Sequence, residues 1–242
     1  MKAPRRLIRH KVQLLRLLRE ILSNEILANE LVFKGGTYAA LRGFLDRFSV
    51  DLDFDLLNQD SSPKVKQELH TIFADLDLAI KDESRNYLQF FLRYDAPENA
   101  RNTLKIDIND APSSFNSYER AQLQEVRMFC QGHTPETMFS NKLVAATARF
   151  EKKGKIAGRD FYDIHRFFEQ GIAVNARVVE ERTGKAHIEY LEYLRDFITK
   201  HITEKRLRED LNPLMDTAKL NKILPHLKPE LLMLLDSEIA RS

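Results

Sequence analysis

Apolar positions recur at helical spacing through the first part of the chain. Residues 5–29 place leucine, isoleucine and valine three or four positions apart, without glycine or proline, which predicts a helix. A short apolar run at 31–33 ends in a glycine pair, and a second helical pattern covers 38–45. Acidic residues then alternate with apolar ones over 50–57, which is typical of a strand. A proline-initiated helical pattern follows at 63–75.

Further strand patterns precede the middle of the chain. Residues 87–94 and 104–108 are rich in aromatic and branched apolar side chains, and a polar turn at 95–102 separates them. Residues 123–130 form another short apolar run, whose length leaves strand and helix unresolved. We therefore expect a sheet in this half of the protein.

The pattern changes at Thr134 and Pro135, which suit a helix N-cap and a first helical turn. Helical patterns then follow one another, at 135–152, 159–170, 175–182, 187–201, 203–208, 213–223 and 228–240. We predict an α+β fold with two domains. The first, residues 1–133, carries the sheet and flanking helices, and the second, residues 134–242, is helical.

Composition adds little, but the distribution of charge is informative. The chain has 242 residues, 43% of them hydrophobic, and a formal net charge of +2. Two basic clusters stand out, Lys2, Arg5, Arg6, Arg9, Lys11, Arg16 and Arg19 near the start, and Arg149, Lys152, Lys153, Lys155 and Arg159 further on. Acidic residues gather at 46–60. This separation predicts a basic rim around an acidic site, although each cluster alone also fits a solvated helix face.

The single cysteine, Cys130, excludes an intramolecular disulfide and a cysteine-based zinc site. No apolar run reaches the length of about 18 residues that a membrane-spanning helix needs. Arg16, Arg19 and Glu20 interrupt the first apolar segment, which argues against a signal peptide. We expect a cytoplasmic protein without a membrane partner.

The acidic strand is the strongest sign of chemistry. Because side chains alternate along a strand, Asp51, Asp53 and Asp55 share one face. Adjacent carboxylates repel one another unless a cation neutralises them, and oxygen ligands suit Mg²⁺. Upstream, Gly35 and Gly36 allow backbone N–H groups to approach a phosphate. Together these features predict metal-assisted phosphoryl chemistry.

The run Phe33-Lys34-Gly35-Gly36-Thr37, followed by Arg47-Phe48-Ser49-Val50-Asp51-Leu52-Asp53-Phe54, resembles the signature of the AbiEii/AbiGii-type nucleotidyltransferase toxins. These toxins are similar to the MenT toxins and belong to the DNA polymerase β-like nucleotidyltransferase superfamily. Either Gly36-Thr37 or Gly35-Gly36 stands in its Gly-Ser position, and Asp107 fits the third carboxylate on a neighbouring strand. The resemblance implies a small mixed-sheet nucleotidyltransferase core.

Two matches in the helical half extend the resemblance. Residues 138–146 resemble the family's helix that carries a lysine, here Lys142, toward the nucleotide. Residues 158–164 resemble its Arg-Asp-x-x-Asp element, which leaves Asp160 and Asp163 both as candidates. Arg149 follows Lys142 by two helical turns and is a further phosphate-binding candidate.

The resemblance also implies roles for the first-half residues. Asp51, Asp53 and Asp107 would bind the catalytic metal ions, and Asp107 would orient the acceptor hydroxyl. The amides of Gly35 and Gly36, with the Thr37 hydroxyl, would hold the triphosphate. Lys142 would place a positive charge on the leaving phosphates. Asp55 is left outside the catalytic set, either beyond the metals or supporting them.

The implied activity is transfer of a nucleoside monophosphate from an NTP to a hydroxyl, with Mg²⁺ or Mn²⁺ as cofactor. The acceptor implied is RNA, at the 3′ end of tRNA, and an antitoxin protein is the expected partner. Two alternatives stay open. One is a nucleotidyltransferase acting on a protein or a small molecule, and the other is a non-catalytic module that binds RNA or protein on the same fold.

Overall fold

A computed structural model describes Met1 and residues 3–241, so Lys2 of the first basic cluster lies outside the described residues. The chain divides into two compact units. The first comprises Met1–Pro112 and Ser117–Thr134, and the second comprises Ser113–Asn116 and the chain from Pro135 onward. The division along the chain therefore falls at Thr134, with one short segment, Ser113–Asn116, belonging to the helical unit.

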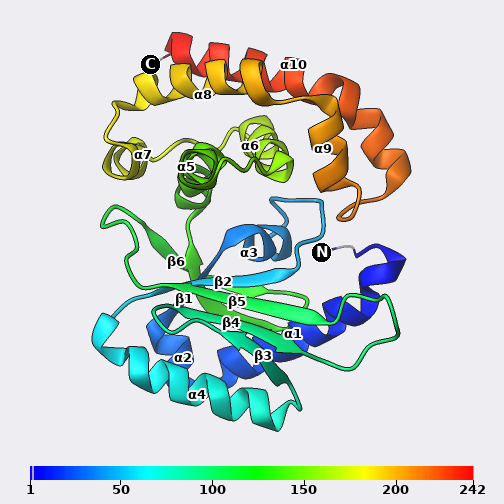
Figure 1. The fold of residues 1–242 in the computed structure, drawn as a ribbon. Helices are drawn as coiled ribbons and strands as arrows, with labels where there is room; N and C mark the ends of the chain where they lie inside the picture. The colour runs from blue at the N-terminus through cyan, green and yellow to red at the C-terminus, as the bar shows by residue number, and fades with distance from the viewer. Residues whose placement is uncertain (2, 242) are drawn as a thin grey trace. The chain divides into compact units, whose positions relative to one another are not determined.

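The first unit is built on a seven-stranded mixed sheet with strand order β3-β4-β5-β2-β1-β7-β6 (Figure 1). The strands are β1 (Leu31–Lys34), β2 (Asp51–Leu56), β3 (Ala79–Glu83), β4 (Leu88–Arg93), β5 (Thr103–Asn109), β6 (Tyr118–Leu123) and β7 (Met128–His133). Strand β2 runs parallel to β5 and β1 runs parallel to β7, whereas the other neighbouring strands are antiparallel. The α+β class predicted from the sequence is confirmed.

Helices cover both faces of this sheet. The helices are η1 (Arg5–Leu7), α1 (Ile8–Ser23), α2 (Glu25–Glu30), α3 (Gly35–Leu41), η2 (Gln59–Ser61) and α4 (Ser62–Asp75). Figure 1 shows α1, α2 and α4 on one face and α3 on the other. The helix predicted over 5–29 is divided because Asn24 is extended and caps α2, its side chain accepting from the Leu27 amide at 3.0 Å.

Alternation along the central strands separates the core from the polar face. In β5, Leu104, Ile106 and Ile108 are buried, while Lys105 and the other intervening residues are partly exposed. The apolar face packs against the helices α1 and α4. The opposite face carries the acidic residues, so the pleat of the sheet brings side chains from two strands onto one surface.

Strands β3 and β6 were not predicted, and the short run at 123–130 is divided between two strands. Strand β3 is an edge strand with mostly exposed residues, so it lacks the apolar alternation that identifies a strand. The run at 123–130 is not a single element, because Leu123 ends β6 and Met128 begins β7. Between them the chain turns, with Arg127 at a positive φ of 56°.

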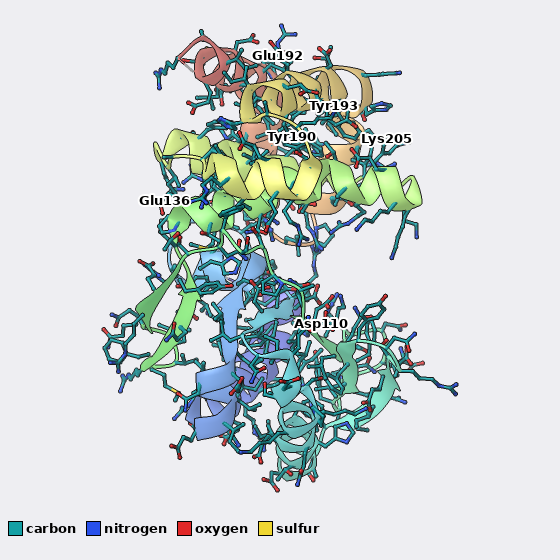
Figure 2. All side chains as sticks on the ribbon, turned by 90° about the vertical axis from the view of Figure 1, so that its left-hand side faces the viewer. Asp110, Glu136, Tyr190, Glu192, Tyr193 and Lys205 are labelled. Atoms are coloured by element: carbon teal, nitrogen blue, oxygen red, sulfur yellow. The ribbon has the colours of Figure 1, made fainter. Side chains whose placement is uncertain are left out.

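The second unit consists of helices α5 (Pro135–Lys153), α6 (Gly158–Glu169), α7 (Ala176–Thr183), α8 (His187–His201), α9 (Glu204–Leu211) and α10 (Thr217–Arg241). Helix α5 packs on α6 and α7, and α10 packs on α6, α8 and α9. Tyr190, labelled in Figure 2, joins α8 to α5 by donating to the Leu143 carbonyl oxygen at 2.6 Å. None of the helices in the described part of the chain has the length and apolarity needed to cross a membrane.

Helix α10 corrects a second prediction. The sequence indicates two helices, at 213–223 and 228–240, because Pro225 and Pro229 each remove a backbone donor. The structure has one helix that contains both prolines. Leucines spaced three or four positions apart along it are buried, namely Leu220, Leu224, Leu227, Leu231 and Leu235. Their burial outweighs the missing hydrogen bonds, which the local pattern alone does not reveal.

Candidate active site

Three carboxylates lie on one surface of the sheet in the first unit. Asp51 and Asp53 lie two apart on β2, and Asp107 lies on β5 directly opposite Asp53 in the parallel ladder. The side chains of Asp51 and Asp107 are 23% and 38% exposed, so this surface is accessible to a ligand. The strand pairing thus places the predicted third carboxylate beside the first two.

Crowding of negative charge is strongest at Asp53. Burial, and then the neighbouring charges of Asp51 and Asp107, raise the pKa of the Asp53 carboxyl to about 6. Lys34 and Lys105 lower this pKa, and the Lys34 effect exceeds that of Asp107, but the net shift is upward because burial is the largest cause. A divalent cation at Asp53 would relieve this repulsion, because its charge favours the ionised form of the carboxyl.

Cationic and amide groups face two of these carboxylates. Arg101, from the loop before β5, places Nη2 3.5 Å from Asp51 Oδ1. Lys105 forms an ion pair with Asp107, and Gln89 donates to the same Asp107 oxygen at 3.0 Å. Among the described residues, no group of three or more acidic, histidine or cysteine side chains converges as a metal cage. Asp51, Asp53 and Asp107 remain the predicted metal ligands.

The glycine pair lies immediately beside the acidic strand. Gly35 has a φ of +76°, and a Cβ atom there would lie 2.3 Å from Asp53 Oδ2. A Cβ atom on Gly36 would lie 3.0 Å from Ser49 Oγ and 3.1 Å from Arg47 Nη2. Only glycine at position 35 lets the backbone approach the Asp53 carboxylate this closely.

Thr37 has a different environment from the one expected of a phosphate ligand. Its side chain is fully buried, and its hydroxyl donates to the Asp51 carbonyl oxygen at 2.5 Å. The hydrogen bond ties α3 to the start of β2. Thr37 therefore ties α3 to Asp51, and its contact with the triphosphate stays a prediction.

Asp55 belongs to a buried polar network instead of the exposed acidic surface. Its side chain is fully buried and accepts from His133 Nε2 at 2.7 Å and Asn109 Nδ2 at 3.1 Å, and Lys34 forms an ion pair with it. Burial alone would raise the pKa of Asp55, but the His133 hydrogen bond and the Lys34 charge hold it well below its usual range. This environment indicates an anchor between β1, β2, β5 and β7.

The remaining predicted residues lie together in the second unit. Lys142 on α5 is 3.0 Å from Asp160 Oδ1 and 3.0 Å from Asp163 Oδ2, both on α6. Arg149 Nη1 lies 3.6 Å from Asp160 Oδ2. Although burial raises the pKa of Asp160, the charges of Lys142, Arg149 and Arg159 outweigh it and lower that pKa. Both aspartates therefore contact Lys142.

Sequence reasoning did not include Arg101, Lys105 or Gln89. Lys105 precedes Asp107 by two positions, so the strand period could have placed both on one face. Gln89 offers no comparable signal, because its contact depends on the antiparallel register of β4 and β5. Arg101 lies in a loop, where periodicity gives no information.

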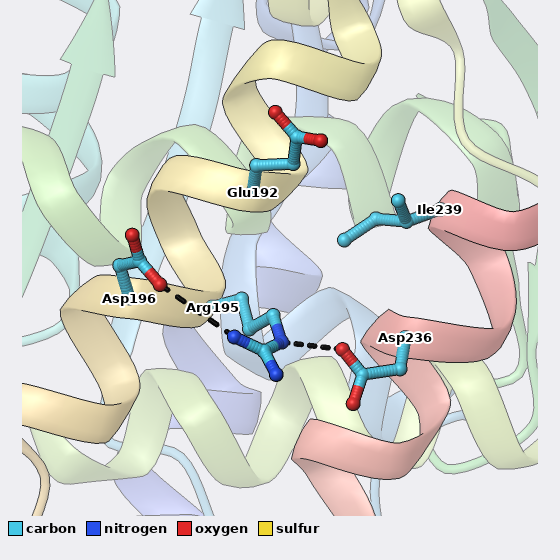
Figure 3. A pocket seen from close by; sticks show the side chains of 5 residues that line it. All are labelled: Glu192, Arg195, Asp196, Asp236 and Ile239. Carbon is cyan, nitrogen blue, oxygen red and sulfur yellow. Dashed lines mark hydrogen bonds and ion pairs between the residues drawn. The ribbon is translucent and has the colours of Figure 1, made fainter.

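A pocket of about 350 Å³ in the second unit is a separate feature (Figure 3). It lies between α8 and α10 and is lined by Glu192, Arg195, Asp196, Asp236 and Ile239. Arg195 lies 3.6 Å from Asp196 and forms an ion pair with Asp236. None of the predicted nucleotide-binding residues lines this pocket, and its acidic lining disfavours phosphate.

Solved structures with the same fold include two proteins from Helicobacter pylori and one from Mycobacterium tuberculosis. The first Helicobacter protein is 22% identical, with a TM-score of 0.59 over 98% of this chain and 96% of that one. JHP933 from Helicobacter pylori is 20% identical, with a TM-score of 0.54 over 98% and 96%. The nucleotidyltransferase toxin MenT4 is 17% identical, with a TM-score of 0.53 over 96% and 85%. At these identities the likeness establishes the fold.

A comparison with curated proteins found no match. The family model for the nucleotidyl transferase AbiEii toxin of type IV toxin–antitoxin systems matches residues 16–233. The match includes the glycine pair, the acidic strand, Asp107 and the Lys142 cluster. This chain therefore belongs to the AbiEii family of nucleotidyl transferase toxins and is a nucleotidyltransferase.

Proposed function

We propose that this toxin transfers a nucleoside monophosphate from an NTP to RNA, with the 3′ end of tRNA as acceptor. The reaction depends on a divalent metal, and an antitoxin protein counteracts the outcome. The observation that carries the proposal is the placement of Asp51, Asp53 and Asp107 on one surface beside Gly35, within a chain of the AbiEii family. This arrangement joins metal-binding oxygens to a backbone that can approach phosphate.

The residues present fit a magnesium or manganese ion. Asp51 and Asp53 supply adjacent carboxylate oxygens, and Asp53 is crowded by negative charge that a cation would neutralise. When bound, the metal would polarise the transferred phosphate and neutralise charge on the triphosphate. Asp107 would orient the acceptor hydroxyl and take its proton, and the amides of Gly35 and Gly36 would contact the triphosphate.

Lys142 is the proposed cation for the leaving phosphates. It is 17% exposed, and the buried carboxylates of Asp160 and Asp163 hold its ammonium group between them. A lysine fixed in this way loses little conformational entropy when it contacts a phosphate. Arg149, which is 40% exposed, is the second candidate on the same helix. Asp160 and Asp163 thus act by positioning Lys142.

A basic surface in the second unit supports an RNA acceptor. The Gly158 amide at the start of α6 donates to Asp210 on α9 at 2.5 Å, and the rings of Phe150 and His201 lie 4.9 Å apart. The first contact joins the start of α6 to the C-terminal end of α9, and a Cβ atom on Gly158 would lie 3.0 Å from the Arg206 carbonyl oxygen nearer the start of α9. The second contact joins the end of α5 to the end of α8. Exposed basic residues on these segments and the adjoining end of α8 are Lys152, Lys153, Lys155, Lys200, Lys205 and Arg206. Figure 2 shows Lys205 away from Glu136, the acidic first turn of α5.

Such a surface would bind phosphate backbone without reading sequence. Replacing Lys152, Lys153 and Lys155 with glutamine should weaken tRNA binding. The slope of the logarithm of the binding constant against the logarithm of the salt concentration should become shallower by about one for each lost phosphate contact. A matched control replaces three exposed lysines elsewhere, Lys64, Lys81 and Lys222. Equal affinities of the two triple variants would remove this support for an RNA acceptor.

The experiment that tests the function incubates purified protein with Mg²⁺, total tRNA and each α-³²P-labelled NTP in turn. The variant Asp51→Asn should lose labelling, whereas Asp60→Asn, an exposed acidic residue on η2, should retain it. Label in tRNA from one NTP would identify donor and acceptor class. Label found only in added protein or small-molecule acceptors would refute the RNA acceptor, and full labelling by Asp51→Asn would refute the acidic centre.

A further inference from the structure

Lys105 occupies an unusual position among the three carboxylates. It lies two residues before Asp107 on β5, so both side chains lie on the same face of the sheet. In the parallel ladder Lys105 is directly opposite Asp51, and Asp107 is directly opposite Asp53. Its ammonium group forms an ion pair with Asp107. A positive charge is therefore built into the acidic surface.

The geometry distinguishes Lys105 from the other cation on this surface. Arg101 comes from a loop, its guanidinium is 41% exposed, and it lies 3.5 Å from Asp51, so a ligand can displace it readily. Lys105 projects from a central strand, is 26% exposed, and has its ammonium group 6.0 Å from the centre of the Phe91 ring. The strand ladder and this packing restrict the positions that its ammonium group can reach.

The charges on this surface match one divalent cation better than two. The carboxylates of Asp51, Asp53 and Asp107 bring three negative charges, and Lys105 neutralises one of them through its ion pair with Asp107. Two divalent cations would exceed the remaining two negative charges even after Arg101 had moved away. The second would also lie close to a fixed ammonium group.

One carboxylate oxygen of Asp107 already has two hydrogen-bonding partners. The oxygen that pairs with Lys105 also accepts from Gln89 Nε2 at 3.0 Å. A metal ligated by Asp107 would have to compete with both donors.

We propose that the Lys105 ammonium takes the place of one metal ion, so that the acidic centre binds a single divalent cation through Asp51 and Asp53. Asp107 is then a carboxylate held by Lys105 and Gln89 for contact with the acceptor and is not a metal ligand. The inference rests on the proposed function, because it concerns the same acidic centre.

Counting bound Mn²⁺ by electron paramagnetic resonance tests this inference without nucleotide or turnover. The full-length wild-type chain should bind one Mn²⁺, and Lys105→Gln should bind two. Lys105→Arg and the control Arg93→Gln, an exposed cation on the adjacent strand β4, should bind one. Asp107→Asn provides an independent variant if Lys105→Gln does not fold, and it should still bind one Mn²⁺.

The possible outcomes separate this inference from the proposed function. Any wild-type stoichiometry other than one overturns the inference, as does a single site in folded Lys105→Gln, or loss of the site in folded Asp107→Asn. If the wild-type chain binds two ions and labels tRNA, only the inference fails. If neither the wild type nor any variant binds Mn²⁺, the metal centre of the proposed function fails as well.

Discussion

The buried histidine of α1 should resist protonation and thereby make the first unit sensitive to acid. His10 is 1% exposed and joins α1 to the residue that precedes the acidic strand. Its Nε2 donates to the Val50 carbonyl oxygen at 2.8 Å, and its Nδ1 lies 2.9 Å from the Tyr94 hydroxyl. That hydroxyl also lies 2.6 Å from the Arg101 carbonyl oxygen. Three hydrogen-bonding contacts therefore involve the His10 ring and the Tyr94 hydroxyl. When the imidazole is neutral, only two protons are available for them, one on His10 and one on Tyr94.

Two physical effects oppose each other at this site. An imidazolium ion would donate from both ring nitrogens and release the Tyr94 proton for Arg101, a gain of about 1 kcal/mol for the added hydrogen bond. Removing a charge from water costs several kcal/mol. Burial and, to a smaller extent, the charge of Arg101 lower the pKa of His10, whereas the hydrogen bond to Val50 raises it. The lowering effects are larger, so the pKa of His10 falls to about 4.

The sign of the effect on stability follows from this pKa. An unfolded histidine has a pKa of about 6.5, so as the pH falls the unfolded chain takes up the proton before the folded one does. His10 thus contributes stability that is present above the unfolded pKa and lost as the pH falls toward the folded pKa. Between neutral pH and pH 5 the loss from this one group is about 2 kcal/mol, from the separation of the two pKa values.

The variant His10→Gln removes the titration, and NMR of the imidazole signals before and after the substitution identifies the His10 resonance. Chelator is included because Val50 adjoins Asp51. The free energy of unfolding of the wild-type first unit should fall about 2 kcal/mol further than that of His10→Gln from neutral pH to pH 5. His226→Gln, at an exposed site, controls for loss of a histidine. A His10 signal that titrates at or above 6.5, or parallel pH profiles for the two proteins, would refute the reasoning.

Three other substitutions should change either the stability or the activity of the protein. Asp55→Asn replaces the buried carboxylate that pairs with His133 and Lys34 by a neutral amide. The free energy of unfolding, measured by thermal denaturation, should fall by about 3–5 kcal/mol, and a fall below 1 kcal/mol would contradict a stabilising role for this buried network. Gly35→Ala strains a positive φ and meets the Asp53 carboxylate, so NTP-dependent labelling should fall at least tenfold, unlike in Gly43→Ala, where φ is also positive but the surroundings are open. Tyr190→Phe removes the hydrogen bond to the Leu143 carbonyl oxygen and the 3.1 Å contact with the buried Thr147 hydroxyl, so it should cost about 1–3 kcal/mol in the second unit, which hydrogen exchange along α5 and α8 would measure.

Much of the fold could be predicted because its signals are local. The acidic strand was expected over 50–57 and is observed as Asp51–Leu56, since alternation every two residues is a property of the strand itself. The helical second half follows from long apolar periodicity in the same way. The exposed edge strand β3 and the two prolines within α10 could not be predicted, because neighbouring elements compensate for a weak or unfavourable local pattern.

The features of the candidate site also separate into those that the local sequence predicts and those that depend on contacts between distant segments. The sequence by itself determined which residue types were available and that Asp51 and Asp53 share a face, because that needs only the period of one strand. Tertiary structure alone decided that Asp55 is buried against His133 and that Lys105 and Asp107 lie opposite Asp51 and Asp53 on the neighbouring strand. Those outcomes depend on strand order, register and desolvation, which act between segments far apart in the chain and leave no periodic trace in it.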